Sequence, residues 1–312
     1  GHYQNSLHLM RDSLATLEQL SATAEVIFNY NYLGAILRHE KNYAEAQNSL
    51  NYGLTLAQKL GDNYQASISL NMLGQIAGLQ GDREQARHYC QEALVLKRQM
   101  GDSRGMTYSL TYLGRLAQSD GNFERAARLF EESMSISEGV GDQRGVAMAL
   151  QNLGGVAQDE GRLEDALSFY QRGRRLFELI GKRSSAIQCV IRLGIVSAKL
   201  EQDEQAEQYL REALQLAADA GFEGEMIQGI LGMARFQLGR ADERQIVNSL
   251  TGLKMVVQHP QSSSAQLMRA EKLLEEAAAD AAADAKKVEL SDYLVPPAEQ
   301  LVVFVRRWLA EV

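Results

Sequence analysis

Residues 71–102 read NMLGQIAGLQGDREQARHYCQEALVLKRQMGD, and this stretch is one copy of a unit that recurs every 40 residues. Each copy carries a Leu-Gly pair, then a single alanine, then a larger residue that is usually apolar. These features fall at Leu33-Gly34, Leu73-Gly74, Leu113-Gly114, Leu153-Gly154 and Leu193-Gly194, at Ala46, Ala86, Ala126, Ala166 and Ala206, and at Leu50, Cys90, Phe130, Tyr170 and Leu210. A fixed period of this length predicts a solenoid, because each unit then buries its open face against the next one.

A second signal recurs at half that step. Glycine falls every 20 residues from Gly61 to Gly181, and Gly221 rejoins the series after Glu201 interrupts it. Most of these glycines precede Asp or Asn. Glycine ends a helix well because it adopts the left-handed conformation without steric cost, and Asp or Asn caps the next helix by accepting its free N–H groups. Each unit is therefore expected to be a pair of antiparallel helices, in an all-α chain.

The glycine of each Leu-Gly pair is expected inside a helix. Glycine there costs roughly 1 kcal/mol against alanine, so a repeated one needs a reason in packing. A glycine on the first helix of a pair, such as Gly74, and an alanine on the second, such as Ala86, would let the two helices approach closely. The larger apolar residues would then fill the remaining space.

At these residues the unit resembles a tetratricopeptide repeat, which has Leu-Gly in its first helix and a small residue followed by a large one in its second. The resemblance covers about residues 22–258. Two features depart from the commonest pattern: the unit is longer than 34 residues, and Gly-Asp replaces the proline after the second helix. This longer variety resembles the repeat arms of bacterial signal-transduction NTPases (STAND type) and transcription regulators, and the Leu-Gly-Asn repeat adaptors. The resemblance implies a right-handed superhelical solenoid.

The pattern divides the chain into three parts. Residues 1–21 are expected to be the second helix of a truncated upstream repeat, because Gln-Asn-Ser-Leu at 4–7 reappears at 47–50. Residues 22–258 hold about six helix pairs, of which the sixth is degenerate. Residues 259–312 follow a break at His259-Pro260 and are expected to form capping helices, the last with an apolar stripe. The truncated first repeat leads us to expect that the chain is a piece of a longer protein.

Composition limits the partners. Lys and Arg number 32 against 40 Asp and Glu, a formal net charge of −8, which disfavours nucleic acid and anionic membranes. No apolar run approaches the ~20 residues that cross a bilayer, and no signal peptide is seen. Cys90 and Cys189 lie at apolar helix positions, as buried free thiols do. We therefore expect a cytoplasmic protein.

No motif indicates catalysis. Glycine-rich strings such as Leu153-Gly154-Gly155 fall inside predicted helices rather than between a strand and a helix, where nucleotide-binding loops lie. The five histidines are dispersed, and neither cysteine has metal-ligand spacing to them. We expect no enzyme, no cofactor and no metal.

The resemblance places the first helix of each pair on the concave side of the solenoid. It implies that residues at fixed offsets from each repeated glycine line a groove suited to a protein or peptide segment. We expect the groove to use Asn31, Arg38, Asn71, Gln75, Tyr108, Thr111, Arg115, Gln118, Gln151, Asn152 and Gln158. Asn152 alone matches the family's clamp for a C-terminal carboxylate, whose lysines are absent. Arg104 and Arg144, in repeated Gly-Asp-x-Arg-Gly strings, resemble arginines that the adaptor relatives turn toward acidic peptides.

Three hypotheses for function remain open at this point. The first is a non-catalytic sensor or interaction arm of a larger signalling regulator, which binds a protein segment or a small effector, with an upstream domain of its own chain as another partner. The second is a free-standing adaptor that bridges two proteins. The third is an oligomerisation module that uses the last helix.

Overall fold

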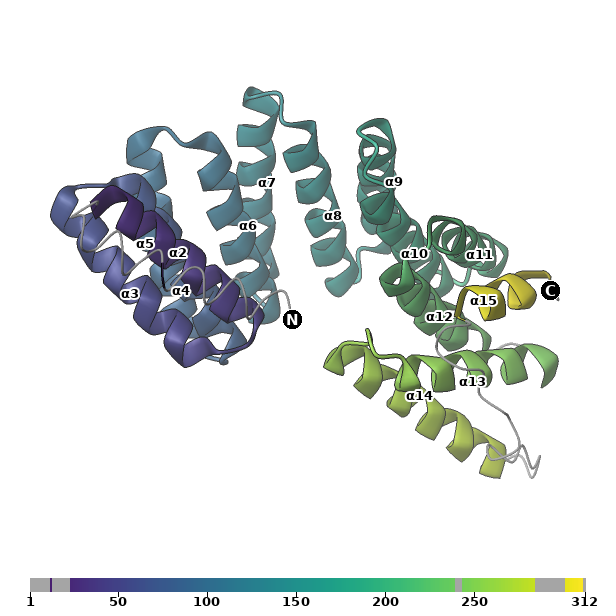
Figure 1. The fold of residues 1–312 in the computed structure, drawn as a ribbon. Coiled ribbons are helices and arrows are strands. Elements are labelled where there is room, and N and C mark those ends of the chain that lie inside the picture. Colours follow the sequence, from purple (N-terminus) through teal and green to yellow (C-terminus); the bar gives the residue numbers. More distant parts are fainter. Residues whose placement is uncertain (1–11, 13–22, 239–242, 284–300, 311–312) are drawn as a thin grey trace. The chain divides into compact units, whose positions relative to one another are not determined.

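The computed structural model describes residues 12, 23–238, 243–283 and 301–310 (Figure 1). Within these ranges every regular element is an α-helix, and consecutive helices from α2 (Thr23–His39) to α12 (Glu223–Gln237) run antiparallel through short turns. The all-α solenoid of antiparallel helix pairs expected from the sequence is thereby confirmed. The expected helix within residues 1–21 lies outside the described part of the chain, apart from Asp12. The expected domain bounds stay a prediction.

The chain divides into two compact units, Gly1–Ala149 and Leu150–Val312, so that the boundary falls within α8. Unit 1 contains α2 (Thr23–His39), α3 (Tyr43–Leu60), α4 (Asn63–Leu79), α5 (Arg83–Met100), α6 (Ser103–Ser119), α7 (Phe123–Gly139) and the start of α8 (Gln143–Asp159). Unit 2 contains the rest of α8 with α9 (Leu163–Leu179), α10 (Arg183–Lys199), α11 (Asp203–Ala220), α12 (Glu223–Gln237), α13 (Glu243–Gln258), α14 (Ser264–Ala283) and α15 (Leu301–Ala310).

The turns between helices are built as the half-period predicts. Gly61, for example, has φ 69° and closes α3, and Asp62 then accepts the Gln65 amide at 3.0 Å to cap α4. The same arrangement recurs where glycine and an acidic or amide residue follow each other. Two positions lack the glycine: Lys41 and Glu201 adopt φ 60° and 59°, a conformation that is strained for residues with a side chain.

Close helix approach accounts for the glycines inside the first helices. A Cβ atom on Gly34, Gly74, Gly114, Gly154 or Gly194 would lie 2.5–2.8 Å from a side-chain atom of the large residue in the paired helix, such as Phe130 opposite Gly114. The alanines at the repeated position of the second helices are fully buried. The repeated glycines and alanines are therefore explained by the close packing of the two helices in each pair.

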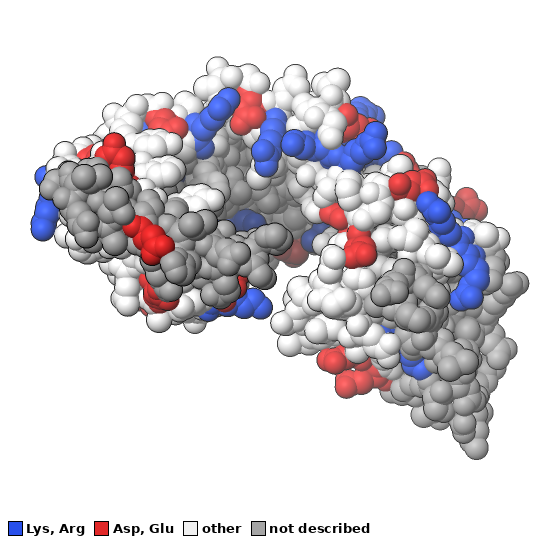
Figure 2. Space-filling model, viewed as in Figure 1, with Lys and Arg blue, Asp and Glu red and all other residues white. Residues whose placement is uncertain are grey.

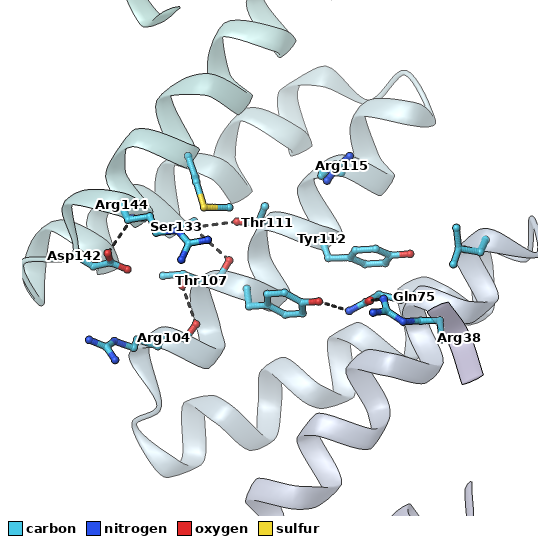
Figure 3. A pocket seen from close by; sticks show the side chains of 15 residues that line it. Arg38, Gln75, Arg104, Thr107, Thr111, Tyr112, Arg115, Ser133, Asp142 and Arg144 are labelled. Carbon is cyan, nitrogen blue, oxygen red and sulfur yellow. Dashed lines mark hydrogen bonds between the residues drawn. The ribbon is translucent and has the colours of Figure 1, made fainter. Parts of the chain in front are cut away.

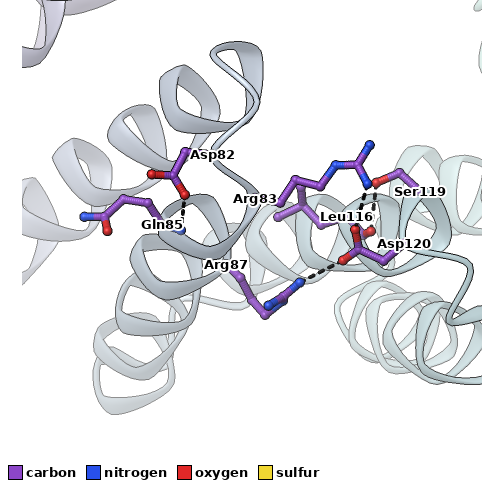
Figure 4. A network of polar contacts seen from close by, with 7 residues as sticks. All are labelled: Asp82, Arg83, Gln85, Arg87, Leu116, Ser119 and Asp120. Carbon is purple, nitrogen blue, oxygen red and sulfur yellow. Dashed lines mark hydrogen bonds and ion pairs between the residues drawn. The ribbon is translucent and has the colours of Figure 1, made fainter.

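Polar contacts join helices of successive repeats. In unit 1, the Asp120 carboxylate lies at the end of α6 and accepts from two arginines of α5, Arg83 at 3.1 Å and Arg87 at 2.7 Å (Figure 4). In unit 2, Arg174 of α9 reaches Glu212 of α11 at 2.5 Å. On the face drawn in Figure 2, acidic and basic side chains are interspersed.

The apolar stripe of the last helix is buried within unit 2. Leu301, Phe304, Val305 and Trp308 of α15 belong to the core cluster that α11, α12 and α13 share. Phe304 and Trp308 lie with ring centroids 5.5 Å apart. No helix in the described ranges has the length and apolar character needed to span a membrane.

Candidate binding site

Unit 1 contains a cavity of about 880 Å³ on the side formed by its first helices (Figure 3). Small-molecule and cofactor sites commonly have volumes of this order, ~300–1,000 Å³. The first helices α2, α4, α6 and α8 supply most of the wall, and α7 adds one serine. The lining residues are Arg38, Gln75, Gly78, Leu79, Arg104, Thr107, Tyr108, Thr111, Tyr112, Arg115, Ser133, Asp142, Arg144, Gly145 and Met148.

One face of α6 supplies the centre of the wall. Arg104, Tyr108, Thr111 and Arg115 follow each other at steps of four, three and four residues, which keeps them on one side of a helix. Tyr108 has 52% of its surface exposed, and its hydroxyl accepts a hydrogen bond from Gln75 of α4. The face thus presents cation, aromatic ring, hydroxyl and cation in order.

Arg38 and Tyr112 shape the end of the cavity near Arg115. The Arg38 guanidinium donates to Gln75, while its buried Nε has no hydrogen-bond partner among the described residues. The Tyr112 hydroxyl donates to the Gly74 carbonyl at 3.3 Å, and a Cβ atom on Gly78 would collide with it. Burial raises the pKa of Tyr112 to about 12, although Arg115 and Arg38 both act to lower it. Both arginines therefore lie near this ring.

Arg104 and Arg144 come from equivalent positions at the start of α6 and α8. The turn before each helix is fixed by an aspartate: Asp102 accepts the Gly105 amide at 2.9 Å, and Asp142 accepts the Gly145 amide at 3.1 Å. A local ion pair with a nearby Asp or Glu would be the simplest role for each of these arginines. Neither makes an ion pair with any described residue, so both guanidinium groups are available at the cavity.

The cavity is strongly cationic. Four arginines line it against one carboxylate, Asp142. Like Arg104 and Arg144, Arg115 has no ion-pair partner within the described ranges. Guanidinium groups bind carboxylate and phosphate through paired hydrogen bonds, so this wall suits an anion in a chain whose overall charge is negative.

A buried ammonium lies beside the cavity wall. Lys97 of α5 is only 4% exposed; its Nζ donates to Ser109 Oγ at 3.1 Å and lies 5.6 Å from the centroid of the Tyr108 ring. Burial lowers its pKa from 10.5 to about 8, with Asp102 acting in the opposite direction. With a pKa of about 8, Lys97 stays mostly protonated near neutral pH, and its charge lies beside Tyr108 but outside the cavity lining.

The structure brings seven of the thirteen predicted site residues together at this cavity. It places others elsewhere: Asn31 and Asn71 are 3% and 5% exposed, and their side-chain oxygens accept from Ser69 and Ser109 of the next repeat. The side chains of these two asparagines are already used in contacts between successive repeats. A role for them in ligand binding stays a prediction. Gln118 of unit 1 is not in the wall, and Gln151, Asn152 and Gln158 belong to unit 2. The residues gathered here are Arg38, Gln75, Arg104, Tyr108, Thr111, Arg115 and Arg144.

The site prediction omitted Tyr112, Thr107, Ser133 and Lys97. The sequence held a signal for Lys97, because the corresponding residues one or more repeats away are small or aromatic and buried: Ala57, Ser137, Phe177 and Ala217. A lysine at such a position is a charge placed in the core. Ser133 had no such signal, because it comes from the second helix of its pair.

Other chemistry finds no support in the described residues. No group of three or more His, Cys, Asp or Glu side chains there is arranged to hold a metal. Cys90 and Cys189 are free and buried, and burial raises the pKa of both thiols to about 12. Thiols with such values stay protonated near neutral pH and are poor nucleophiles.

Comparison of the sequence with protein families finds the tetratricopeptide repeat at residues 23–99, 103–179 and 145–219, which together make up more than half of the chain. No curated protein matches the sequence.

Several solved structures share the fold at low sequence identity. The apo form of the quorum sensor NprR from B. thuringiensis is 13% identical, with a TM-score of 0.70 over 97% of this chain and 83% of that one. A Signal Transduction ATPase with Numerous Domains from Pyrococcus horikoshii, which has a tetratricopeptide repeat sensor, is 15% identical, with a TM-score of 0.67 over 93% of this chain but 42% of that one. A Rap protein complexed with competence and sporulation factor is 16% identical, with a TM-score of 0.60 over 98% and 86%.

Proposed function

Because the chain belongs to the tetratricopeptide repeat family, we propose that it is a non-catalytic binding module whose cavity in unit 1 holds an acidic segment of a partner protein. The observation that carries the proposal is the set of unpaired arginines at that cavity. Arg104, Arg115 and Arg144 face the same space, and no described carboxylate forms an ion pair with any of them. An unpaired cation at a concave wall gains most by binding an external anion.

The wall has the other features that a peptide site needs. Gln75 supplies amide groups that hydrogen-bond a peptide backbone, and Thr107 and Thr111 supply hydroxyls. Tyr108 and Met148 supply apolar surface, both exposed. A cavity that mixes charge, amide and aromatic groups suits a side-chain-bearing segment better than a bare inorganic ion.

We place this module in a cytoplasmic signalling regulator, as its sensor or interaction arm. The support is similarity of fold to a signal-transduction ATPase with a repeat sensor and to a quorum sensor. An upstream domain of the same chain is one source of the acidic segment. A nucleotide-binding loop encoded upstream in the full-length gene would agree with this placement.

Co-purification tests the proposal. The protein is used as bait in lysate of its source cell, beside Arg104→Gln with Arg115→Gln and a control, Arg128→Gln. Arg128 of α7 is exposed, pairs with Glu124 at 3.5 Å and is outside the cavity. We expect a partner that wild type and the control recover and the double variant loses. A partner that the double variant retains would place binding elsewhere.

A free-standing adaptor is the second candidate, and it would recover two different proteins in that experiment. Oligomerisation through the last helix has less support, because Leu301, Phe304, Val305 and Trp308 are already buried against α11, α12 and α13.

A further inference from the structure

The cationic groups of the cavity fall into two sets along the α6 face. Arg104 and Arg115 are the first and last residues of that face, and they are eleven positions apart in the sequence. Eleven residues make about three helical turns, so the two side chains leave the helix in nearly the same direction, with Cα atoms about 16 Å apart. The two arginines therefore mark opposite ends of one wall.

A second arginine reinforces each end. Arg144 of α8 occupies the position in its repeat that Arg104 has in α6, and Figure 3 shows both at the same end of the cavity. Arg38 of α2 lies with Arg115 at the other end, where Figure 3 shows them on either side of the Tyr112 ring. Each end thus offers two guanidinium groups, from different helices.

The stretch between the ends carries no charged side chain in the cavity wall. Tyr108 and Thr111 of α6 lie there, with Thr107 beside them. The one acidic residue of the wall, Asp142, lies at the Arg104 end, where its Oδ1 already accepts the Gly145 amide. This end is therefore less positive than the other, where Arg38 and Arg115 have no acid beside them in the wall.

We infer that the cavity selects an extended acidic peptide by the spacing of two carboxylates, which bind one at each end of the α6 face. An extended chain advances about 3.3 Å per residue, so a span of about 16 Å corresponds to acidic residues about five positions apart. The inference rests on the proposed function and adds the spacing that the ligand must have.

Three synthetic peptides of identical composition test the spacing. Each is blocked at both termini and carries two glutamates in a chain of Gly, Ala and Ser, with the glutamates two, five or eight residues apart. Isothermal titration at fixed ionic strength gives the dissociation constants. We expect the five-residue spacing to bind about tenfold more tightly than either of the others, because only that peptide engages both ends at once.

Variants at each end assign the contacts. Two double variants, Arg104→Gln with Arg144→Gln and Arg38→Gln with Arg115→Gln, each remove both arginines of one end, and each is titrated with the best peptide and with its two single Glu→Gln forms. We expect each variant to lose about tenfold in affinity and to become insensitive to one of the two glutamates, a different one in each case. Circular dichroism checks that both variants fold.

The outcomes separate the two proposals. Equal affinities for the three wild-type titrations would overturn the spacing while leaving acidic-peptide binding in place. If none of the three peptides binds to the wild-type protein, acidic-peptide binding in this cavity is overturned together with the spacing.

Discussion

At the scale of single residues, Lys97 is the least expected feature of the protein. It occupies a core position and makes no ion pair with a described residue; its contacts are Ser109 Oγ and the Tyr108 ring. Burying an ammonium without a carboxylate costs stability. Its place beside Tyr108 suggests that the charge is kept for the cavity rather than for folding.

Replacing Lys97 should stabilise the fold in a way that depends on pH. The folded-state pKa of about 8 is lower than the ordinary 10.5, so the unfolded chain binds more protons between these values and wild-type stability rises with pH across that window. We expect Lys97→Met to be more stable than wild type at pH 7 by up to about 3 kcal/mol, with a smaller difference at pH 10. Urea unfolding at the two pH values measures this, and the exposed Lys59→Met is the control. A difference that does not change with pH would contradict the assignment.

Gly114 is constrained by space. We expect Gly114→Ala to destabilise the protein by about 1–3 kcal/mol, because its Cβ would lie 2.6 Å from Cε1 of the buried Phe130 ring. Gly139→Ala, in an α7 position with nothing within 4 Å, should leave the midpoint of urea unfolding unchanged or slightly raised. Equal effects of the two substitutions would show that close packing is not the reason for the glycine.

At the scale of elements, the two units cap their helices differently. In unit 1, α3 to α7 each begin with an Asp or Asn whose side chain accepts a backbone N–H. In unit 2, α9 to α12 begin with Arg162, Lys182, Gln202 and Phe222, none of which makes such a bond. A side chain that caps one of these helices in unit 2 should therefore stabilise it.

Lys182→Asp should stabilise α10 by about 1 kcal/mol, because aspartate there can accept the free amide and favours the positive end of the helix dipole. Lys199→Asp makes the same charge change in the last turn of α10, where it should be unfavourable. Thermal unfolding compares the two, and stabilisation by both would point to net charge as the cause.

Glu201→Gly should also stabilise unit 2, by about 1 kcal/mol, since the left-handed conformation at φ 59° is strained for glutamate and free for glycine. Glu204→Gly, within α11, should instead cost about 1 kcal/mol. The midpoints of thermal unfolding give both signs, and a loss of stability in the Glu201 variant would refute the account of this turn.

At the scale of the whole molecule, the chain consists of two compact units with their own buried clusters. Trp308, the single tryptophan, is 3% exposed in the cluster of unit 2. Its fluorescence therefore reports on unit 2. In a repeat protein each element depends mainly on its neighbours, so damage to one unit should affect the other less.

Leu301→Ala should lower the urea midpoint of Trp308 fluorescence, with a cost of about 2–5 kcal/mol, because Leu301 is buried in the same cluster. Val303→Ala on the same helix should have little effect, since Val303 is 64% exposed. Gly114→Ala in unit 1 should lower the urea midpoint measured by circular dichroism more than the midpoint measured by Trp308 fluorescence. Equal shifts in both signals would mean that the chain unfolds as one unit.

The sequence predicted most of the fold because the packing rules are periodic. Gly34, Gly74 and Gly114 recur because a paired helix lies against each. The pair Gly61-Asp62 recurs as Gly-Asp or Gly-Asn because most turns of unit 1 have the same construction. The binding site was predicted only in part. The position of a residue in the repeat tells which face of the helix it is on, but not how deeply its side chain is buried.

Asn31, Asn71 and Thr111 share one register but have different roles. Ser69 and Ser109 of the next repeat bond to the two asparagines and bury them, whereas the equivalent of these serines in the repeat after Thr111 is Ala149. Thr111 is therefore left at the cavity wall. Whether such a side chain is buried or lines the cavity depends on the residue that faces it from the next repeat, and the position of a residue in its own helix does not reveal this.

A crystal structure of the protein with the five-residue-spaced glutamate peptide would show directly whether the cavity binds two carboxylates. We expect an extended peptide along α6, with one carboxylate within hydrogen-bonding distance of Arg104 or Arg144 and the other within that distance of Arg38 or Arg115. A peptide bound outside this cavity, or one whose carboxylates point away from these arginines, would contradict it.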